Sequence, residues 1–364
     1  MKNNEMMNRA TKPIRVGMMS SLAEKTGAAL RGEYIFHALQ EYADVYYFRP
    51  NKKRGILNYF LFIPKDIARS FYKKFDFFIV LKPFPGACIP ALINRFFTKS
   101  KLIFDIDDLD HTYRKGFTAR IIESMQKYFV RKADYVAVQK NEDLIRYIAN
   151  SWKIDPEKII TIEQGVDAEL FKPFHNPASQ IKPERKEKII CFTGHLGQTA
   201  VAELTSLLRI YKKLNREDVK LIIAGGGSKL EYFKAFAKNL NLKIIFTGYL
   251  RNTEFPAILD SADICLCYYI DRECNHYRNS MKVREYLSMG KLVVSTNVGD
   301  LKKFKDYTIQ TNPCEEEFLL GLQTALSKKE SPQDAIRRRA FITKNFSWKK
   351  IMKEFSETLK GIQQ

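Results

Sequence analysis

Carboxylates gather in one short stretch of the chain, and carboxylates can hold metal ions or move protons. The stretch contains Asp105, Asp107, Asp108, Asp110 and His111. Three roles fit these residue types: a site for a hard cation such as Mg²⁺, a general base, or a helix cap beside solvated neighbours. We expect Asp107 and Asp108 to point into a cleft, because they stand at the end of a predicted strand.

A second candidate site lies in the stretch from Asn275 to Asp300. Its pattern predicts a short helix capped by Ser280 or Asn279, because a side-chain oxygen there accepts from free amides of the first turn. Gly290 stops that helix in the left-handed conformation. A buried strand then follows. The free amides at the start of such a helix form a natural site for an anion.

Glu285 stands in the second turn of this predicted helix, off its apolar face. An anion site with a carboxylate one turn away suits a nucleotide, with the diphosphate at the amides and the sugar hydroxyls at Glu285. The alternative is an amphipathic helix before a core strand, with Glu285 solvated.

Glycines follow three other predicted strands. They are Gly27, the Gly194–Gly197 loop that includes His195, and Gly225–Gly227. Glycine lets the backbone approach a ligand closely. It also makes tight turns without any ligand, and for the triple glycine this second explanation is the simpler one.

Alternating strands and helices must position these loops, and the alternation occurs twice. In the first half we expect strands at 14–20, 44–48, 77–82, 102–107, 134–139 and 159–163. In the second half we expect them at 189–193, 220–224, 243–247, 264–268, 292–296 and 307–310. Long apolar strands separated by helices are typical of a doubly wound parallel sheet. Two such α/β sheets would face each other across a cleft, with ligands outside the carboxyl ends of the strands.

The composition narrows the class of protein. The 364 residues carry a net charge of +20, which favours anionic partners: nucleic acid, acidic membrane surfaces or phosphorylated small molecules. Six cysteines without a C-x-x-C pair favour small core residues in a reducing compartment, and no zinc site. We see neither a secretory signal nor a membrane span. We therefore expect a cytoplasmic protein, or one bound to the inner face of the membrane.

Several motifs occur in the order found in GT-B glycosyltransferases of the family 4 type (group 1), which the chain resembles. The segment S-x-K-x-x-E-Y-x-x-x-G-x-x-V-V is matched by Ser280, Lys282, Glu285, Tyr286, Gly290, Val293 and Val294. The crossing N-G-V-D-x-x-x-F-x-P is matched by Gln164, Gly165, Val166, Asp167, Phe171 and Pro173. F-x-G and the closing F-S-W are matched by residues 246–248 and 346–348. Together these matches span about residues 14 to 362.

The resemblance implies a GT-B fold with two Rossmann-like domains and a division of labour between them. Residues 1–173 would bind the acceptor, 174–188 would link the domains, and 189–347 would bind a nucleotide sugar, UDP- or GDP-linked. A final helix at about 348–364 would pack back on the first domain. The sugar would be transferred with retention of configuration, without a bound metal or other cofactor, to a saccharide or lipid-linked acceptor.

The resemblance also implies roles for single residues. Glu285 would hold the ribose hydroxyls. The amides near Ser280 and Met281 would meet the diphosphate, which Gly27 would approach from the other domain. The loop that begins at Gly194 would lie beside the same donor.

The chain departs from the family pattern at three places. Tyr277 stands where the family commonly has a second glutamate. His195 stands where the family places an arginine, and the lysine expected after it is missing. Arg278 and Lys282 are then the candidate cations for the diphosphate, although either could be an ordinary surface charge. At the end of the fourth strand, Asp107-Asp108 replaces the family's histidine, and His111 lies just beyond; these three are the catalytic candidates.

Three functions remain open on the sequence. The first is a cytoplasmic glycosyltransferase for cell-surface glycans, whose aromatic and basic stretches at 59–74 and 117–132 suit an anionic membrane surface. The second is a nucleotide-sugar-binding protein without transferase activity, either a partner subunit or an epimerase-like enzyme. The third, a nucleic-acid binder, rests on charge alone, and we expect no nucleic acid because no recognition motif is present.

Overall fold

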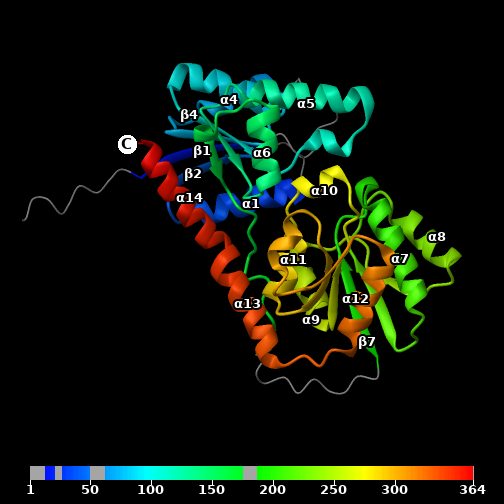
Figure 1. Cartoon of the computed structure of the whole chain (residues 1–364). Coiled ribbons are helices and arrows are strands. Elements are labelled where there is room, and N and C mark those ends of the chain that lie inside the picture. Colours follow the sequence, from blue (N-terminus) through cyan, green and yellow to red (C-terminus); the bar gives the residue numbers. More distant parts are fainter. Residues whose placement is uncertain (1–12, 21–26, 50–61, 175–186, 364) are drawn as a thin grey trace, which may run out of the picture.

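Two six-stranded parallel sheets organise the computed structural model, which describes residues 13–20, 27–49, 62–174 and 187–363 (Figure 1). The first sheet has the order β2-β1-β3-β4-β5-β6 and the second the order β12-β11-β10-β7-β8-β9. The predicted α/β fold class is therefore confirmed. Some of the residues singled out from the sequence lie outside the described residues, namely Lys25, Thr26, Tyr59, Phe60 and most of the expected linker.

The strands of both sheets fall where the apolar runs predicted them. The first sheet consists of β1 (Arg15–Ser20), β2 (Asp44–Phe48), β3 (Phe77–Leu81), β4 (Lys101–Ile106), β5 (Tyr135–Val138) and β6 (Ile159–Thr161). The second consists of β7 (Lys188–Thr193), β8 (Val219–Ala224), β9 (Ile244–Phe246), β10 (Ile264–Cys267), β11 (Leu292–Thr296) and β12 (Ile309–Thr311). Strands β3, β10 and β11 are buried throughout, because helices cover both faces of each sheet.

Helices cover the first sheet on both sides. The helices of this half are α1 (Gly27–Leu39), α3 (Ile63–Ser70), α4 (Pro85–Thr98), α5 (Gly116–Val130) and α6 (Glu142–Ser151). Helix α14 (Trp348–Gln363), the end of the chain, packs beside α1 on one face of this sheet, whereas α4 and α5 cover the other face (Figure 1). The final helix thus packs on the first half of the chain.

The second sheet is covered in the same way. Its helices are α7 (Val201–Leu214), α8 (Leu230–Asn239), α9 (Phe255–Ser261), α10 (Glu273–Tyr277), α11 (Met281–Ser288), α12 (Glu315–Ser327) and α13 (Pro332–Phe346). Helices α7, α8 and α12 enclose one core with the sheet, and α9, α11 and α13 enclose another. The domain boundaries predicted from the sequence stay a prediction, because residues 175–186 lie outside the described part.

Either of two prolines, Pro85 and Pro90, could mark the start of helix α4. The helix begins at the earlier one, Pro85, and Pro90 lies inside it. Pro85 is favourable there because the first-turn amides have no intrahelical partner and the fixed φ of proline suits a helix start. The sequence offered two prolines for one helix start, and the earlier one begins the helix.

The two places where the chain crosses between the sheets lie side by side. The amide of Val166 donates to the carbonyl of Phe346 at 2.9 Å, and the amide of Trp348 donates back to Val166 at 3.2 Å. Gly165 is required here, because a β-carbon at this position would lie 2.5 Å from the ring of Trp348. The matched crossing motif and the closing F-S-W motif therefore form one joint between the two halves.

Among the described residues, no helix is long and apolar enough to cross a bilayer. Five of the six cysteines are buried, at positions 88, 191, 265, 267 and 274, and Cys314 is exposed.

Candidate functional site

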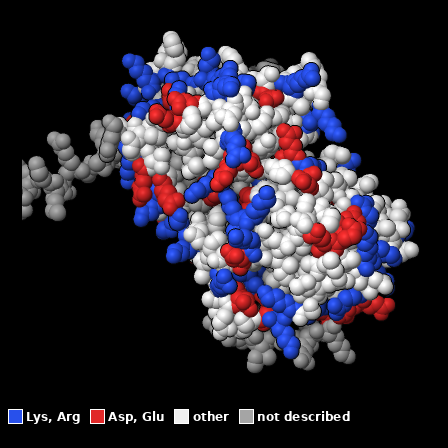
Figure 2. All heavy atoms as spheres, in the orientation of Figure 1, with Lys and Arg blue, Asp and Glu red and all other residues white. Residues whose placement is uncertain are grey.

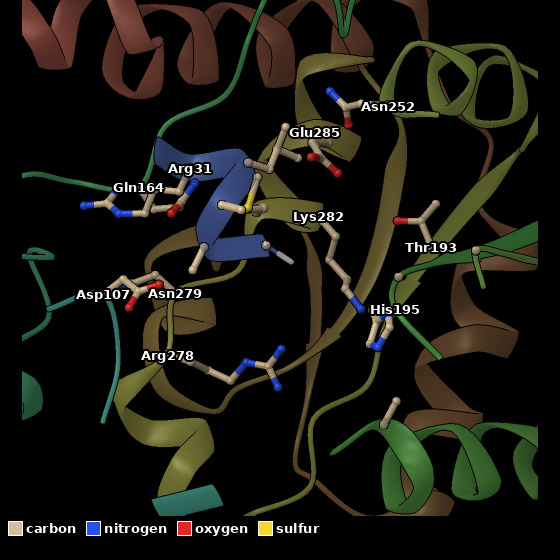
Figure 3. A pocket seen from close by; sticks show the side chains of 18 of the residues that line it. Arg31, Asp107, Gln164, Thr193, His195, Asn252, Arg278, Asn279, Lys282 and Glu285 are labelled. Atoms are coloured by element: carbon tan, nitrogen blue, oxygen red, sulfur yellow. The ribbon is translucent and has the colours of Figure 1, made fainter. Parts of the chain in front are cut away.

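A cavity of about 680 Å³ lies between the carboxyl ends of the two sheets (Figure 3). Both halves of the chain line it. Of the site residues expected from the sequence, nine line this cavity: Gly27, Asp107, Asp108, Gly194, His195, Arg278, Met281, Lys282 and Glu285. Ser280 and His111 do not. Parallel strands end at one edge of each sheet, which is why loops distant in sequence meet here.

Helix α11 contributes two charged side chains to the cavity lining, Lys282 and Glu285. Ser280 caps this helix, since its hydroxyl accepts from the amide of Val283 at 3.4 Å. The backbone amide of Ser280 donates to the carboxylate of Asp300 at 3.2 Å. That amide is therefore already engaged and the residue is buried behind the cavity wall. Among the two amides expected to meet a diphosphate, the one at Met281 belongs to a residue that lines the cavity.

Lys282 and Arg278 bring two cations to the same wall. The Lys282 ammonium lies 4.1 Å from the ring centre of Phe192, beside the loop at Gly194. Burial lowers the pKa of Lys282, and Arg278 lowers it further. The Arg278 guanidinium lies 4.5 Å from the ring centre of Tyr269. Burial opposes its charge, but Tyr269 and other nearby acidic groups raise the pKa of Arg278 above its ordinary value.

Glu285 lies on the same helix, between the cations and the upper part of the cavity (Figure 3). Its carboxylate makes no hydrogen bond or ion pair with a described residue. Burial raises the pKa of Glu285 to about 7, and the positive charge of Lys282 only partly offsets this effect. A carboxylate held ready in this way can accept hydrogen bonds from a bound ligand.

Glycines form the floor beside these charges. Gly225 has a φ of 135°, and a β-carbon there would lie 2.0 Å from the carbonyl oxygen of Gly194. Two chain segments, after β7 and after β8, can thus touch through backbone alone. Gly225 and Gly226 line the cavity.

The first half of the chain contributes an acidic cluster with a lysine at its centre. The Lys82 ammonium lies 2.7 Å from Asp107 and 2.9 Å from Asp110, and it also pairs with Asp108. Lys82 is buried and has a left-handed φ of 61°. The cation among these carboxylates is thus the side chain of Lys82, and no metal-binding group of His, Cys, Asp or Glu is found among the described residues.

The carboxylates of this cluster differ in acidity. Burial raises the pKa of Asp107 to about 7, against the lowering effect of Lys82. Burial acts the same way on Asp108, but there Lys82, Arg278 and Tyr113 together outweigh it, and the pKa falls below its ordinary value. Tyr113 adds a hydrogen bond of 3.1 Å to Asp108. At neutral pH, Asp107 is therefore the group of this pair that can exchange a proton.

His111 and Tyr277 lie outside the cavity lining. His111 Nε2 lies 3.1 Å from the hydroxyl of Tyr147, and burial lowers its pKa. The ring of Tyr277 packs 5.4 Å from that of Tyr147, against the core of the first half. Tyr277, which stands at the position of the family's second glutamate, therefore packs between the two halves of the chain. His195 is exposed and lines the cavity.

Sequence reasoning missed several residues of the site. Lys82 directly follows an entirely apolar predicted strand. A lone lysine at the end of such a strand was the signal that could have identified it. Arg31, Asn252 and Asn279 also line the cavity (Figure 3). Arg31 pairs with Asp105 at 2.9 Å, which removes that carboxylate from the candidates. Nothing in the sequence pattern marked Arg31 or Asn252, and Asn279 was considered only as a helix cap.

Residues 187–320, which include α11 and the glycine floor, match the family described as Glycosyl transferases group 1. The order of motifs and the two-sheet architecture agree with that match. Over this stretch the chain is similar to the group 1 glycosyltransferases.

Curated proteins similar to this chain extend the match. The chain is 24% identical over 316 residues to an uncharacterized glycosyltransferase of Methanocaldococcus jannaschii, covering 78% of this chain and 75% of the relative. It is 33% identical to an alpha-monoglucosyldiacylglycerol synthase of Streptococcus pneumoniae, over 43% of this chain and 37% of the relative.

Solved structures show the GT-B fold of this chain over nearly its whole length. A sucrose-phosphate synthase from Thermosynechococcus elongatus superposes with a TM-score of 0.75 at 13% identity, covering 96% of this chain and 99% of that one. Anabaena HepE, in complex with UDP and glucose, superposes with a TM-score of 0.73 at 15% identity, covering 96% and 100%.

Proposed function

We propose that the chain transfers a sugar from a UDP- or GDP-linked donor to a saccharide or lipid-linked acceptor in cell-surface glycan synthesis. Its relatives include proteins named lipopolysaccharide 1,2-N-acetylglucosaminetransferase, from Salmonella typhimurium, and putative teichuronic acid biosynthesis glycosyltransferase, from Bacillus subtilis. The GT-B neighbour with bound UDP-glucose supports a nucleotide sugar as donor. The absence of a long apolar helix among the described residues is compatible with a place on the cytoplasmic side.

One observation carries the proposal: Arg278, Lys282 and Glu285 line one wall of one cavity. Two cations suit a diphosphate, and a carboxylate that no described residue hydrogen-bonds suits the two hydroxyls of a ribose. In this arrangement Met281 offers a backbone amide and Gly194 and Gly27 allow close approach. The arginine and lysine of the family pattern are absent, and Arg278 and Lys282 supply positive charge in their place.

The proposed reaction breaks the bond between the sugar's anomeric carbon and the diphosphate oxygen. Negative charge then develops on the diphosphate, and Arg278 and Lys282 stabilise it inside a partly buried cavity where electrostatic interactions are strong. The acceptor hydroxyl forms the new bond on the same face, which retains the configuration. No metal ion is part of this proposal.

The acceptor hydroxyl must lose a proton, and two groups can receive it. One is the departing diphosphate oxygen, which lies on the attacked face. The other is Asp107, whose raised pKa of about 7 makes it a better base than Asp108 at neutral pH. We assign Asp107 to the acceptor side because it lines the wall built by the first half of the chain.

A ligand-shift experiment tests the donor site. UDP and GDP, with their common sugars, are added to the full chain and the unfolding temperature is measured, since ligand binding raises it by mass action. Arg278→Ala or Lys282→Ala is expected to weaken nucleotide binding about 10- to 100-fold, as for a lost hydrogen bond to a charged group. Glu273→Ala on α10 is the control, because that exposed carboxylate lies outside the cavity lining. Equal binding by all four proteins would refute this site.

The second candidate is a nucleotide-sugar-binding protein without transferase activity. The loss of the family's basic pair, and a Tyr277 that faces the other half rather than the cavity, favour it. Donor turnover separates the two functions: hydrolysis or transfer from a UDP- or GDP-sugar that disappears in Glu285→Ala supports the transferase. Tight binding with no turnover on any acceptor supports the alternative.

A further inference from the structure

Helix α5 presents an unusual stripe of large apolar side chains to solvent. Phe117, Ile121 and Tyr128 are 79%, 50% and 59% exposed. Their spacing places them on one side of the helix, while Phe129 and Val130 on its other side are buried in the core. The helix therefore has an inner apolar face that the fold uses and an outer apolar stripe that it does not.

Cations surround this stripe. The exposed basic residues on and beside α5 are Arg114, Lys115, Arg120, Arg131 and Lys132. Glu123 is the single acidic residue between positions 114 and 132. It accepts a hydrogen bond of 2.6 Å from Tyr147, so its charge is directed toward α6 rather than outward. The outer face of α5 thus combines apolar side chains with positive charge alone.

The end of α4 continues the same surface. Phe96 and Phe97 are 80% and 70% exposed, and their ring centres lie 5.2 Å apart. Arg95 ties this end of α4 to the end of α5 by donating to the carbonyl of Lys132 at 2.7 Å. Beside Phe96 is a hollow of about 400 Å³ lined also by Lys99 and Lys101.

These two helices lie together along one edge of the first domain (Figure 1). The same edge carries a concentration of Lys and Arg in the space-filling view (Figure 2). We call the exposed residues of α4 and α5 named above the α4–α5 face.

We propose that the α4–α5 face docks on an anionic lipid bilayer. Phenylalanine and tyrosine side chains insert at the depth of lipid headgroups, and lysine and arginine side chains pair with lipid phosphates and with the negative surface. The α4–α5 face offers both kinds of side chain, because it has five large apolar groups and cations around them. A nucleic acid would be matched by the cations but would leave Ile121 and the phenylalanines without a partner.

This docking goes beyond the proposed function, because it needs neither donor nor acceptor. It would also place the cavity close to lipid: α5 begins just after the short helix Asp110–Tyr113, whose Tyr113 lines the cavity.

Vesicle co-sedimentation of the full chain tests the proposal. We expect the chain to bind vesicles of phosphatidylglycerol mixed with phosphatidylcholine at low salt, and not vesicles of phosphatidylcholine alone. Lys115→Glu with Arg120→Glu is expected to lower the partition coefficient about tenfold or more, because each cation near an anionic surface adds about fivefold. Phe117→Ser with Ile121→Ser is expected to lower it as well, at unchanged net charge.

Matched controls are available on the other domain. Lys212→Glu with Lys238→Glu makes the same change in charge at exposed positions of α7 and α8, and Leu320→Ser removes an exposed apolar group from α12. Both are expected to bind vesicles as the original chain does. Phe117→Trp should show a blue-shifted fluorescence with anionic vesicles, quenched by brominated lipid.

Three outcomes would overturn the proposal. The first is no binding of the original chain to anionic vesicles at low salt. The second is an equal loss of binding in the control variants, which would mean that overall charge is responsible. The third is a dimer in solution that the Phe117→Ser, Ile121→Ser variant converts to a monomer without any change in vesicle binding, which would make this face a subunit interface.

Discussion

The Lys82 ammonium lies 2.7 Å from the carboxylate of Asp107, at the wall of the cavity between the two sheets. This pair decides the character of the acidic loop. Asp108 and Asp110 lie close to the same ammonium. The positive charge of Lys82 therefore offsets the repulsion among the three carboxylates. Burial raises the pKa of Asp107 and the positive charge of Lys82 lowers it, with a net value of about 7, so Asp107 titrates near neutral pH.

Removing this lysine should destabilise the protein. Lys82→Met leaves three neighbouring carboxylates without their cation, and breaking a buried pair in this way costs about 3–5 kcal/mol. The loss should grow as pH rises, because the carboxylates of the variant are then forced to ionise. Urea unfolding at pH 5 and pH 8 measures it. Lys73→Met, an exposed partner of Asp44, is the control and should change stability by less than about 1 kcal/mol.

Glu285 should make the ligand-free protein less stable as pH rises. Its folded-state pKa of about 7 exceeds the ordinary value, so the folded state holds its proton more tightly than the unfolded state. Stability therefore falls as pH rises from about 4.5 to 7, where the unfolded state releases the proton first. Glu285→Gln keeps the neutral form and should be about 1–2 kcal/mol more stable than the original at pH 8, allowing for its partial exposure.

The comparison at pH 4 completes this test. There both proteins carry a neutral side chain, so their unfolding temperatures should converge. Glu273→Gln, at an exposed position of α10, should show no such crossing with pH. A Glu285→Gln variant that is less stable than the original at pH 8 would contradict the assignment of a desolvated carboxylate. Nucleotide affinity should fall in the same variant, since a neutral amide is a weaker acceptor for ribose hydroxyls.

Much of the fold followed from the sequence, because periodicity and buried strands are local signals. The run Leu292–Thr296 has the length and composition of a covered strand, and it is one. The Ser280 cap was equally readable, since a cap depends on a few adjacent residues. Glu285 came from its spacing within a motif, and the structure places it in the cavity.

The remaining features depend on contacts between distant segments, which spacing does not encode. Lys82 meets Asp107 only because β3 and β4 are neighbours in the sheet. Tyr277 turns away from the cavity because Tyr147, on α6, offers it an aromatic partner in the other half. The start of α4 at Pro85 was hidden because Pro90 carries the same local signal.

Placing the family's glutamate at position 277 should not create a side chain that binds the donor sugar. Tyr277 packs on Tyr147 at the boundary of the two halves, so Tyr277→Glu places a carboxylate against a core rather than in the cavity. We expect a loss of about 1–3 kcal/mol in stability, from the lost aromatic contact and the buried charge, and no gain in affinity for any UDP- or GDP-sugar.

Tyr277→Phe is the matched control for this change. It keeps the ring and should leave stability within about 0.5 kcal/mol of the original. Unfolding in urea and nucleotide-sugar titration check both variants. Tighter sugar binding by Tyr277→Glu would show that this position does reach the donor.

Gly27 offers a way to separate donor binding from stability. It is the first residue of α1 and lines the cavity, and a β-carbon built there meets no atom within 4 Å. Gly27→Val should therefore fold as well as the original, with an unfolding temperature changed by about 2 °C or less in the absence of ligand. If the diphosphate approaches this glycine, the added side chain fills its space and nucleotide affinity should drop about tenfold or more, as for a clash that costs about 1.4 kcal/mol or more.

Gly225→Ala is the contrasting variant. Its β-carbon would lie 2.0 Å from the Gly194 carbonyl at a φ of 135°, so it should lose stability and nucleotide binding together. Thermal unfolding with and without UDP or GDP measures both quantities for each variant. A Gly27→Val protein that binds nucleotide as tightly as the original would place the diphosphate away from α1. The donor would then be held by the second domain alone, through Arg278 and Lys282.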